Sequence, residues 1–197
     1  MNDTALLVVD MEEDFVRGPM AVSGAEALAQ RLAPLIAAAR DAGMVVVFVT
    51  QSLRPGDIGP LARFDDVREG RVLSEGTPGV RVVPELEPQP SDSFVVKRRF
   101  GAFLGTDLDL LLRTRGVIRV VVCGISAHVC CDTTVREAFQ LGYEPVYLVD
   151  GVSMGDLPDL GWGPVSAADA QRVIATTIAH RFGTVATIDD FLATLRR

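Results

Sequence analysis

Three side chains that could together perform nucleophilic chemistry stand directly after apolar runs of the sequence. They are an acid, an amine and a thiol: Asp10 in VVDMEEDF, Lys97 in VVKRRFGAF and Cys130 in VVCGISAHVCCDTT. A cysteine attacks as its thiolate, and its pKa falls beside a positive charge or at a helix N-terminus. Lys97 would supply that charge, while Asp10 would take the thiol proton and later return it to a leaving amine. Backbone N–H groups in the turn 124–130 would stabilise a tetrahedral oxyanion, by about 2.7–4 kcal/mol per donor.

Cysteine and histidine are scarce in this chain. It has only two histidines, His128 and His180, and three cysteines, Cys123, Cys130 and Cys131. Two histidines are too few for a histidine-rich metal site and make a catalytic histidine less expected, so the sequence favours chemistry that needs neither. Cys131 is the rival nucleophile at this point. It would lie one step into the next helix, turned by about 100° from Cys130, and we expect both it and Cys123 to be packed inside. Three clustered cysteines do not make a secreted disulfide framework, which favours a cytoplasmic location.

Apolar runs and helical repeats alternate along the chain, and this alternation must position the three reactive side chains. We expect strands over 5–9, 44–50, 93–97, 117–123, 145–149 and 185–187, and helices over 25–42, 106–115, 131–141, 166–182 and 188–195. Strands buried on both faces that alternate with helices predict a parallel sheet covered on both sides. The prediction is therefore α/β: one three-layer α/β/α domain over residues 1–197, with about six mainly parallel strands. Ligands bind such sheets outside the carboxyl ends of the strands, where Asp10, Lys97 and Cys130 fall.

Two stretches do not fit the alternation, 51–93 and 156–164, and both are rich in proline or glycine. Long irregular segments inside a compact domain are usually functional or carry short elements of their own. We therefore expect these two stretches to shape a pocket beside the reactive side chains.

The composition excludes several classes of protein. The chain has 197 residues and a formal net charge of −7, with no basic run. Phosphate attraction dominates binding to nucleic acids and contributes to binding at anionic membranes, so neither is an expected partner. No apolar run approaches the roughly 20 residues that span a bilayer, and Met1–Thr4 does not resemble a signal peptide. A small molecule is the expected partner, with no cofactor.

Three motifs taken together resemble the isochorismatase-like cysteine hydrolase superfamily. They are DMEEDF, KRRFGAFLGTDLD and VVCGISAHVCCDTTVREAFQLGY, in the usual order and spacing. The resemblance implies a Rossmann-like fold and an Asp–Lys–Cys triad of Asp10, Lys97 and Cys130. The family spacing from Gly124 and to Thr134 fits Cys130 as the nucleophile, in preference to Cys131. It also implies a cis peptide at Ile125–Ser126, an oxyanion hole built from the N–H groups of Ser126 and Cys130, and assembly as a homodimer or homotetramer.

The sequence departs from its relatives at positions that bear on the substrate. The stretch TQSLRPGDIGPLARFDD lacks the histidines of metal-dependent nicotinamidases, so no metal site is expected. Ala127 and His128, together with Gln51, are similar to isochorismatases, although the thiol is retained. Ala127 stands where the family usually has threonine, and Phe100 where it usually has tyrosine.

Several further side chains are candidates for contact with the substrate. They are Phe15, Gln51, Phe100, Ala127, His128 and Trp162. The competing interpretation for the aromatic residues is ordinary core packing, and for Gln51 a hydrogen bond within its loop. Arg98 or Arg99 would bind a substrate carboxylate or, with equal weight, be a solvated or interface residue.

The leading hypothesis is a metal-independent cysteine hydrolase that cleaves a C–N bond of a small amide, ureide or carbamoyl compound through a Cys130 acyl-enzyme. An isochorismatase-type vinyl ether hydrolase, with Asp10 as general acid and the thiol a bystander, is the first alternative. A catalytically silent binding module on the same fold is the second.

Overall fold

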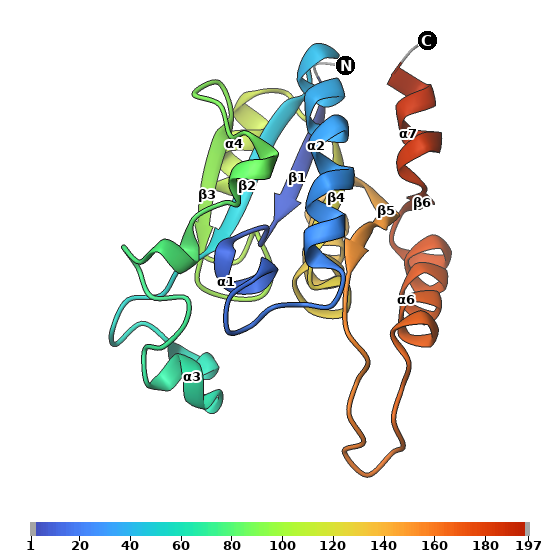
Figure 1. The fold of residues 1–197 in the computed structure, drawn as a ribbon. Coiled ribbons are helices and arrows are strands. Elements are labelled where there is room, and N and C mark those ends of the chain that lie inside the picture. The colour runs from blue at the N-terminus through green and yellow to red at the C-terminus, as the bar shows by residue number, and fades with distance from the viewer. Residues whose placement is uncertain (1–2, 196–197) are drawn as a thin grey trace.

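A six-stranded parallel sheet forms the centre of the computed structural model, which describes residues 3–195 (Figure 1). The strands are β1 (Thr4–Val9), β2 (Val45–Gln51), β3 (Ser93–Lys97), β4 (Arg119–Ile125), β5 (Glu144–Ser153) and β6 (Thr184–Ala186). Their order is β3-β2-β1-β4-β5-β6, with every neighbouring pair parallel. The order reverses between β1 and β4, which is where parallel sheets of this kind open a ligand crevice. Met1 and Asn2, on which the signal-peptide prediction partly rests, lie outside the described residues, as do residues 196–197.

Helices cover both faces of the sheet and complete three layers. The longer helices are α2 (Ala25–Asp41), α4 (Leu108–Thr114), α5 (Asp132–Gln140), α6 (Ala167–Arg181) and α7 (Ile188–Leu195). Apolar side chains of α2 and α7 pack in one core with one face of the strands, while those of α4, α5 and α6 pack in a second core with the other face. The α/β fold class predicted from strand–helix alternation is therefore confirmed.

The strands form where the apolar runs predicted them. Every residue of β1 is buried, as expected of a strand covered on both sides. The main difference is β5, which continues to Ser153 instead of ending at Val149. Its pairing with β4 shifts register between Val122 and Gly124, so the Asp150–Gly151 segment that resembles a turn is accommodated as an irregularity within a longer strand.

The first irregular stretch forms a small apolar unit of its own at the carboxyl end of the strands (Figure 1). It contains η1 (Gly59–Arg63), α3 (Asp65–Arg68), η2 (Pro78–Val80) and η3 (Pro84–Leu86). Its own buried cluster consists of Leu53, Leu61, Val67, Val72 and Leu73. The short helix α1 (Glu13–Val16) holds this unit in place, because Asp14 Oδ2 accepts a 2.7 Å hydrogen bond from the backbone N–H of Leu73.

The second irregular stretch, between β5 and α6, projects away from the body of the molecule (Figure 1). Leu157 and Val165 pair across its base. At its tip, Asp159 Oδ1 accepts hydrogen bonds from the N–H groups of Gly161 and Gly163, at 2.8 and 3.0 Å. None of the helices formed by residues 3–195 has the length and apolar character that a bilayer crossing requires.

Candidate active site

The structure brings Asp10, Lys97 and Cys130 together at the carboxyl edge of the sheet. Asp10 follows β1, Lys97 ends β3, and Cys130 lies in the π-helical turn η4 (Ala127–Cys131) between β4 and α5. Lys97 Nζ lies 2.8 Å from Asp10 Oδ2 and donates to Cys130 Sγ at 3.5 Å. All three residues are buried. Three segments distant in sequence thus place an acid, an amine and a thiol within contact distance, as the strand-end argument predicts.

The Lys97 ammonium is fully enclosed by acceptors. Besides Asp10 and Cys130, it donates to Gln51 Oε1 at 3.1 Å and to the Arg99 carbonyl at 3.2 Å. An ammonium has three N–H donors, so these four neighbours already exceed its capacity. Lys97 is therefore fixed in position, with its charge directed at the carboxylate and the sulfur.

Burial sets the protonation of the site. Burial raises the pKa of the Cys130 thiol, and the charge of Asp10 raises it further, so the nearby Lys97 does not lower it overall. The lowered thiol pKa expected from the sequence is therefore wrong, because desolvation outweighs the ammonium. Burial also raises the pKa of Asp10 above its ordinary value despite Lys97. For Lys97, burial alone would lower the pKa, but Asp10 and Cys130 raise it overall. The thiol thus holds its proton beside a carboxylate that has become a stronger base.

The turn before Cys130 has the geometry that the resemblance implies. The Ile125–Ser126 peptide bond is cis. The Ser126 carbonyl accepts hydrogen bonds from the N–H groups of Val129 and Cys131, each at 3.1 Å. Ser126 and Cys130 both border the pocket, and their N–H groups stay the predicted oxyanion hole. Gly124 is required just upstream, because its φ is +119° and a Cβ there would lie 2.0 Å from the Val9 carbonyl oxygen.

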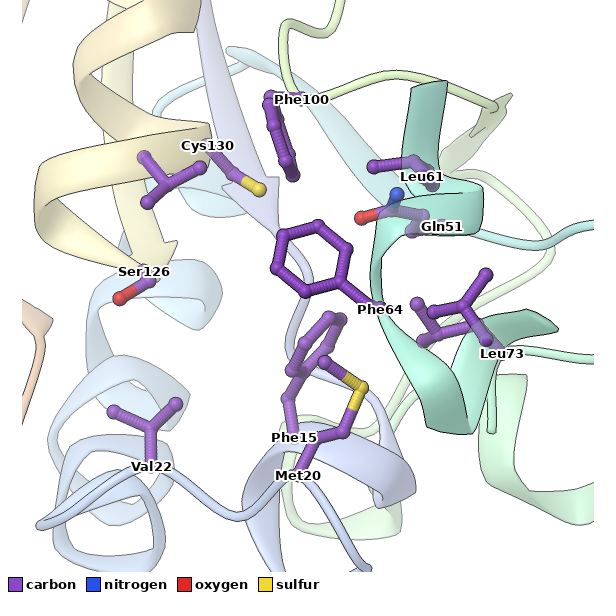
Figure 2. Close-up of a pocket in the computed structure, with 12 residues that line it drawn as sticks. Phe15, Met20, Val22, Gln51, Leu61, Phe64, Leu73, Phe100, Ser126 and Cys130 are labelled. Carbon is purple, nitrogen blue, oxygen red and sulfur yellow. The ribbon is translucent and has the colours of Figure 1, made fainter. Parts of the chain in front are cut away.

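A pocket of about 240 Å³ opens at Cys130 (Figure 2). Its lining residues are Phe15, Met20, Val22, Gln51, Leu61, Phe64, Val67, Leu73, Phe100, Ser126, Val129 and Cys130. Three of the six side chains expected to contact substrate, Phe15, Gln51 and Phe100, are among them. Sequence reasoning missed most of the apolar wall, which comes from the segment after α1 and from the unit between β2 and β3. Of the two irregular stretches expected to shape a pocket, 51–93 does so, whereas 156–164 contributes no residue to this lining. No periodicity in 51–93 identifies which of its residues line the pocket.

The other three expected contact residues lie outside this lining. Ala127 is fully buried in the core shared with α4, α5 and α6, because η4 turns its side chain inward. His128 is half-buried, and its Nδ1 lies 3.2 Å from Ser126 Oγ, so it contacts a lining residue and not the cavity. Trp162 is 95% exposed at the tip of the projecting 154–166 segment, where the Gly161 and Gly163 turns direct it away from the chain.

Glu12 is a buried acid beside the site that sequence reasoning missed. Its Oε1 accepts the backbone N–H of Gln51 at 3.2 Å, and Oε2 has no hydrogen-bond partner among the described residues. Burial, with the charge of Asp10, raises the pKa of Glu12 well above its usual range. Glu12 therefore supports the strand end that carries Gln51, whose side chain in turn holds Lys97. The feature of the sequence that could have identified Glu12 is its position two residues after Asp10.

The remaining cysteines and arginines considered as candidates do not line the pocket. Cys123 and Cys131 are fully buried, and neither borders the pocket. Arg98 donates to the Ser52 carbonyl at 3.1 Å, and Arg99 to the carbonyls of Asp57 and Arg98. Neither arginine lines the pocket. Within residues 3–195, no group of three or more His, Cys, Asp and Glu side chains is arranged to hold a metal ion.

A doubly covered parallel sheet with a buried thiol, ammonium and carboxylate at its strand ends defines the class of α/β cysteine hydrolases. The chain belongs to the isochorismatase family: the family described as "Isochorismatase domain" matches residues 4–190. It is 32% identical over 213 aligned positions to ureidoacrylate amidohydrolase RutB of Variovorax paradoxus, covering 97% of this chain and 81% of that protein.

Two solved structures show the same fold. A cysteine hydrolase from Pseudomonas syringae pv. phaseolicola superposes with a TM-score of 0.93 at 35% identity, covering 99% of this chain and 93% of that one. N-carbamoylsarcosine amidase from Thermoplasma acidophilum superposes with a TM-score of 0.77 at 26% identity, covering 95% and 97%. The chain is an isochorismatase-family hydrolase.

Proposed function

We propose that this protein hydrolyses the C–N bond of a small amide, ureide or carbamoyl compound through an acyl-enzyme on Cys130. The observation that carries the proposal is the position of the Cys130 sulfur, at the pocket and 3.5 Å from a Lys97 ammonium that lies 2.8 Å from the Asp10 carboxylate. The names of two relatives, an amidohydrolase and an amidase, support a C–N bond as the target.

The reaction follows from the protonation of the three groups. Asp10 takes the thiol proton as the Cys130 sulfur attacks the substrate carbonyl carbon, and the oxyanion forms beside the N–H groups of Ser126 and Cys130. The C–N bond then breaks, and Asp10 passes the proton to the leaving nitrogen, which leaves a thioester on Cys130. Water attacks the thioester while Asp10 takes its proton, the C–S bond breaks to release the acid, and Asp10 returns the proton to the Cys130 thiolate. Lys97 stays protonated throughout because its pKa is raised, and it stabilises the transient thiolate.

The direct test is a comparison of two neighbouring cysteines. Cys130→Ala should reduce ammonia or amine release from a good amide substrate by at least about 10³-fold, because the nucleophile is lost. Cys131→Ala is the matched control, since Cys131 does not border the pocket, and it should keep most of the activity. Turnover that survives Cys130→Ala would contradict the proposal.

The two alternative hypotheses are less well supported, and the vinyl ether hydrolase rests only on the similarity of Ala127, His128 and Gln51 to isochorismatases. Vinyl ether hydrolysis by Asp10 alone predicts pyruvate release from isochorismate that survives Cys130→Ala, and the relatives named for amide cleavage do not favour it. A silent binding module predicts an unreactive Cys130. Assays of pyruvate release and of Cys130 alkylation separate both from the proposal.

We also propose that the protein assembles as a homodimer or homotetramer and that it acts in a reducing compartment such as the cytoplasm. Support comes from the projecting 154–166 segment, which exposes the apolar side chains of Leu160 and Trp162, and from the three free thiols. Changing both Leu160 and Trp162 to serine should lower the mass measured by light scattering. Val173→Ser, another exposed apolar position, is the control and should not change it. A monomeric parent chain, or a double variant with the parent's mass, would refute the proposed assembly.

A further inference from the structure

The pocket wall beyond the reactive sulfur is almost entirely apolar. Only Gln51, Ser126 and Cys130 among its lining residues carry polar side chains, and Gln51 Oε1 already accepts from Lys97. The Phe64 ring lies in the middle of the space that the Cys130 sulfur faces, with Phe100 beside it (Figure 2). Whatever part of a substrate extends past the scissile carbonyl must therefore contact aromatic and aliphatic side chains.

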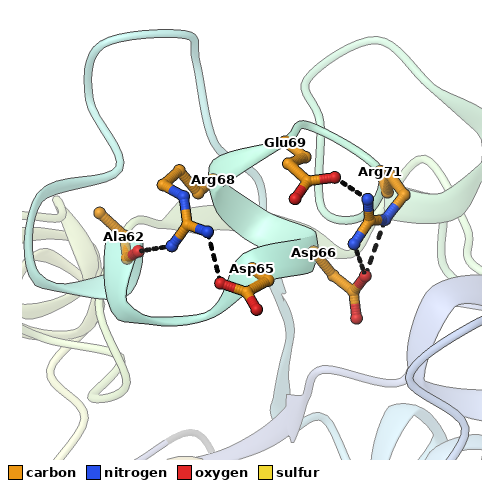
Figure 3. Close-up of polar contacts among 6 residues, drawn as sticks. All are labelled: Ala62, Asp65, Asp66, Arg68, Glu69 and Arg71. Carbon is orange, nitrogen blue, oxygen red and sulfur yellow. Dashed lines mark hydrogen bonds and ion pairs between the residues drawn. The ribbon is translucent and has the colours of Figure 1, made fainter.

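None of the cationic side chains described in residues 3–195 borders this space. Lys97 is enclosed by four acceptors. Figure 3 shows that the arginines of the α3 region are engaged locally: Arg68 with Asp65 and the Ala62 carbonyl, and Arg71 with Asp66 and Glu69.

The remaining nearby arginines are also outside the pocket. The exposed Arg63 guanidinium lies over the Phe64 ring, 5.7 Å from its centroid. Arg98 and Arg99 donate to backbone carbonyls. A substrate carboxylate placed in the pocket would therefore find no cation among the residues that line it.

The charges beneath the pocket offer an anion no net attraction. The buried Lys97 ammonium there is already paired with the Asp10 carboxylate at 2.8 Å, and the whole chain carries a formal charge of −7. Moving a carboxylate from water into an apolar site without a partner is strongly unfavourable, because the charge loses its hydration. A neutral aromatic or branched aliphatic group gains from burial of its surface instead.

We propose that this hydrolase selects amides or ureides whose remaining part is apolar and uncharged, and that it discriminates against substrates bearing a carboxylate. The inference rests on the proposed function and separates this chain from relatives named for ureidoacrylate and N-carbamoylsarcosine, both of which carry a carboxylate.

Two alkylating amides of nearly the same shape test the charge preference without requiring turnover. They are N-(4-nitrophenyl)chloroacetamide and N-(4-carboxyphenyl)chloroacetamide, whose nitro and carboxylate groups match in size and differ in charge. The Cys130 sulfur displaces chloride from the carbon next to the carbonyl, so that an S–C bond replaces the C–Cl bond, chloride leaves and Asp10 takes the thiol proton. Labelling of the full chain is followed by intact mass, the site is located by peptide mass spectrometry, and each rate is divided by the reagent's rate with glutathione. The neutral reagent should label Cys130 at least about 100-fold faster.

A cation introduced into the wall should reverse much of this preference. Phe64→Arg is suited to the purpose because Phe64 borders the pocket yet is 43% exposed, so the fold should tolerate the change. We expect the rate ratio to fall at least about tenfold, because the guanidinium pairs with the carboxylate. Leu110→Arg on α4, with Leu110 69% exposed, adds the same charge away from the site and should leave the ratio unchanged. Phe64→Leu controls for loss of the ring.

The possible results separate the two proposals. Equal rates, or faster labelling by the carboxylate reagent, would overturn the specificity inference and leave the Cys130 nucleophile intact. If the ratio of the two labelling rates fell in Leu110→Arg as well as in Phe64→Arg, the inference would also be overturned, because the added charge would then act at long range and not within the pocket. If neither reagent labels Cys130, the proposed function fails. Calorimetric binding of 4-nitrobenzamide against 4-carbamoylbenzoate then decides the inference, with tighter binding of the nitro compound expected and equal or weaker binding refuting it.

Discussion

Replacing Lys97 by methionine tests whether the buried ammonium holds the site together. The side chain is 0% exposed, and its Nζ lies 2.8 Å from Asp10 Oδ2. At an effective dielectric constant of about 20, two unit charges at that separation attract by about 6 kcal/mol. The replacement also removes the cost of burying the ammonium, so the net loss expected for breaking a buried pair is about 3–5 kcal/mol at pH 7. Methionine has a similar length, so the loss reflects charge and not a cavity.

The pH dependence of this loss has a defined sign. The pKa of Asp10 is already raised above its ordinary 3.8 by burial, and Lys97 is the group that lowers it most. Removing Lys97 raises that pKa further. A carboxyl group with a higher pKa in the folded than in the unfolded state contributes stability below about pH 4, and this contribution is lost as the pH rises through the folded pKa. The difference in stability between Lys97→Met and the parent chain should therefore be smallest near pH 4 and grow toward pH 8.

Urea unfolding at several pH values measures the effect, with m-values checked for constancy. The control is the double variant with Asp10→Asn and Lys97→Met, which removes both charges together. It should regain most of the lost stability while staying inactive. A Lys97→Met chain within about 1 kcal/mol of the parent at pH 7 would refute the reasoning, as would a double variant no more stable than the single one.

Two further predictions concern the backbone and the pocket wall. Gly124→Ala should destabilise by about 2–5 kcal/mol, because φ is positive and the new Cβ meets the Val9 carbonyl at 2.0 Å; Gly142→Ala, with φ +87° and open space around it, should cost only about 1–2 kcal/mol. Equal thermal shifts in the two variants would contradict this. Asp14→Ala leaves the buried Leu73 N–H unpaired, at about 1–3 kcal/mol, and should raise KM while leaving the iodoacetamide reactivity of Cys130 unchanged. Asp14→Asn, which keeps an acceptor, should restore KM, and a loss of Cys130 reactivity in Asp14→Ala would show that α1 supports the triad directly.

The sequence predicts the meeting of the acid, amine and thiol well because the edge where they lie depends on the sheet. A continuous apolar run such as β1 favours a strand that is buried on both faces. Parallel strands then bring their carboxyl ends to the same edge of the sheet. That argument brings Asp10 and Lys97 to one edge with the turn that carries Cys130, and the family resemblance then selects Cys130 over Cys131. It says nothing of how deeply the thiol is buried, and for this reason the direction of the Cys130 pKa was wrong: Cys130 packs in the core shared with α4, α5 and α6 and is only 5% exposed.

The pocket wall is harder to predict because its residues have no repeat. Leu61, Val67 and Leu73 pack against one another in a cluster apart from the two sheet cores, and their spacing follows neither a helix nor a strand. Ala127 was misplaced for a related reason, since a π-helical turn changes which face a residue presents. Trp162 is a large aromatic residue of the type that often lines a pocket, but the turns at Gly161 and Gly163 direct its side chain outward.

The separate cluster between β2 and β3 has a consequence for how such an enzyme changes over time. Its apolar residues contact one another and α1, while the strands that carry the acid, amine and thiol have their own cores. Substitutions in the cluster can therefore alter what enters the pocket without disturbing the chemistry at the sheet edge. The position of the three reactive side chains is set by the sheet, whereas the pocket wall can be altered one side chain at a time.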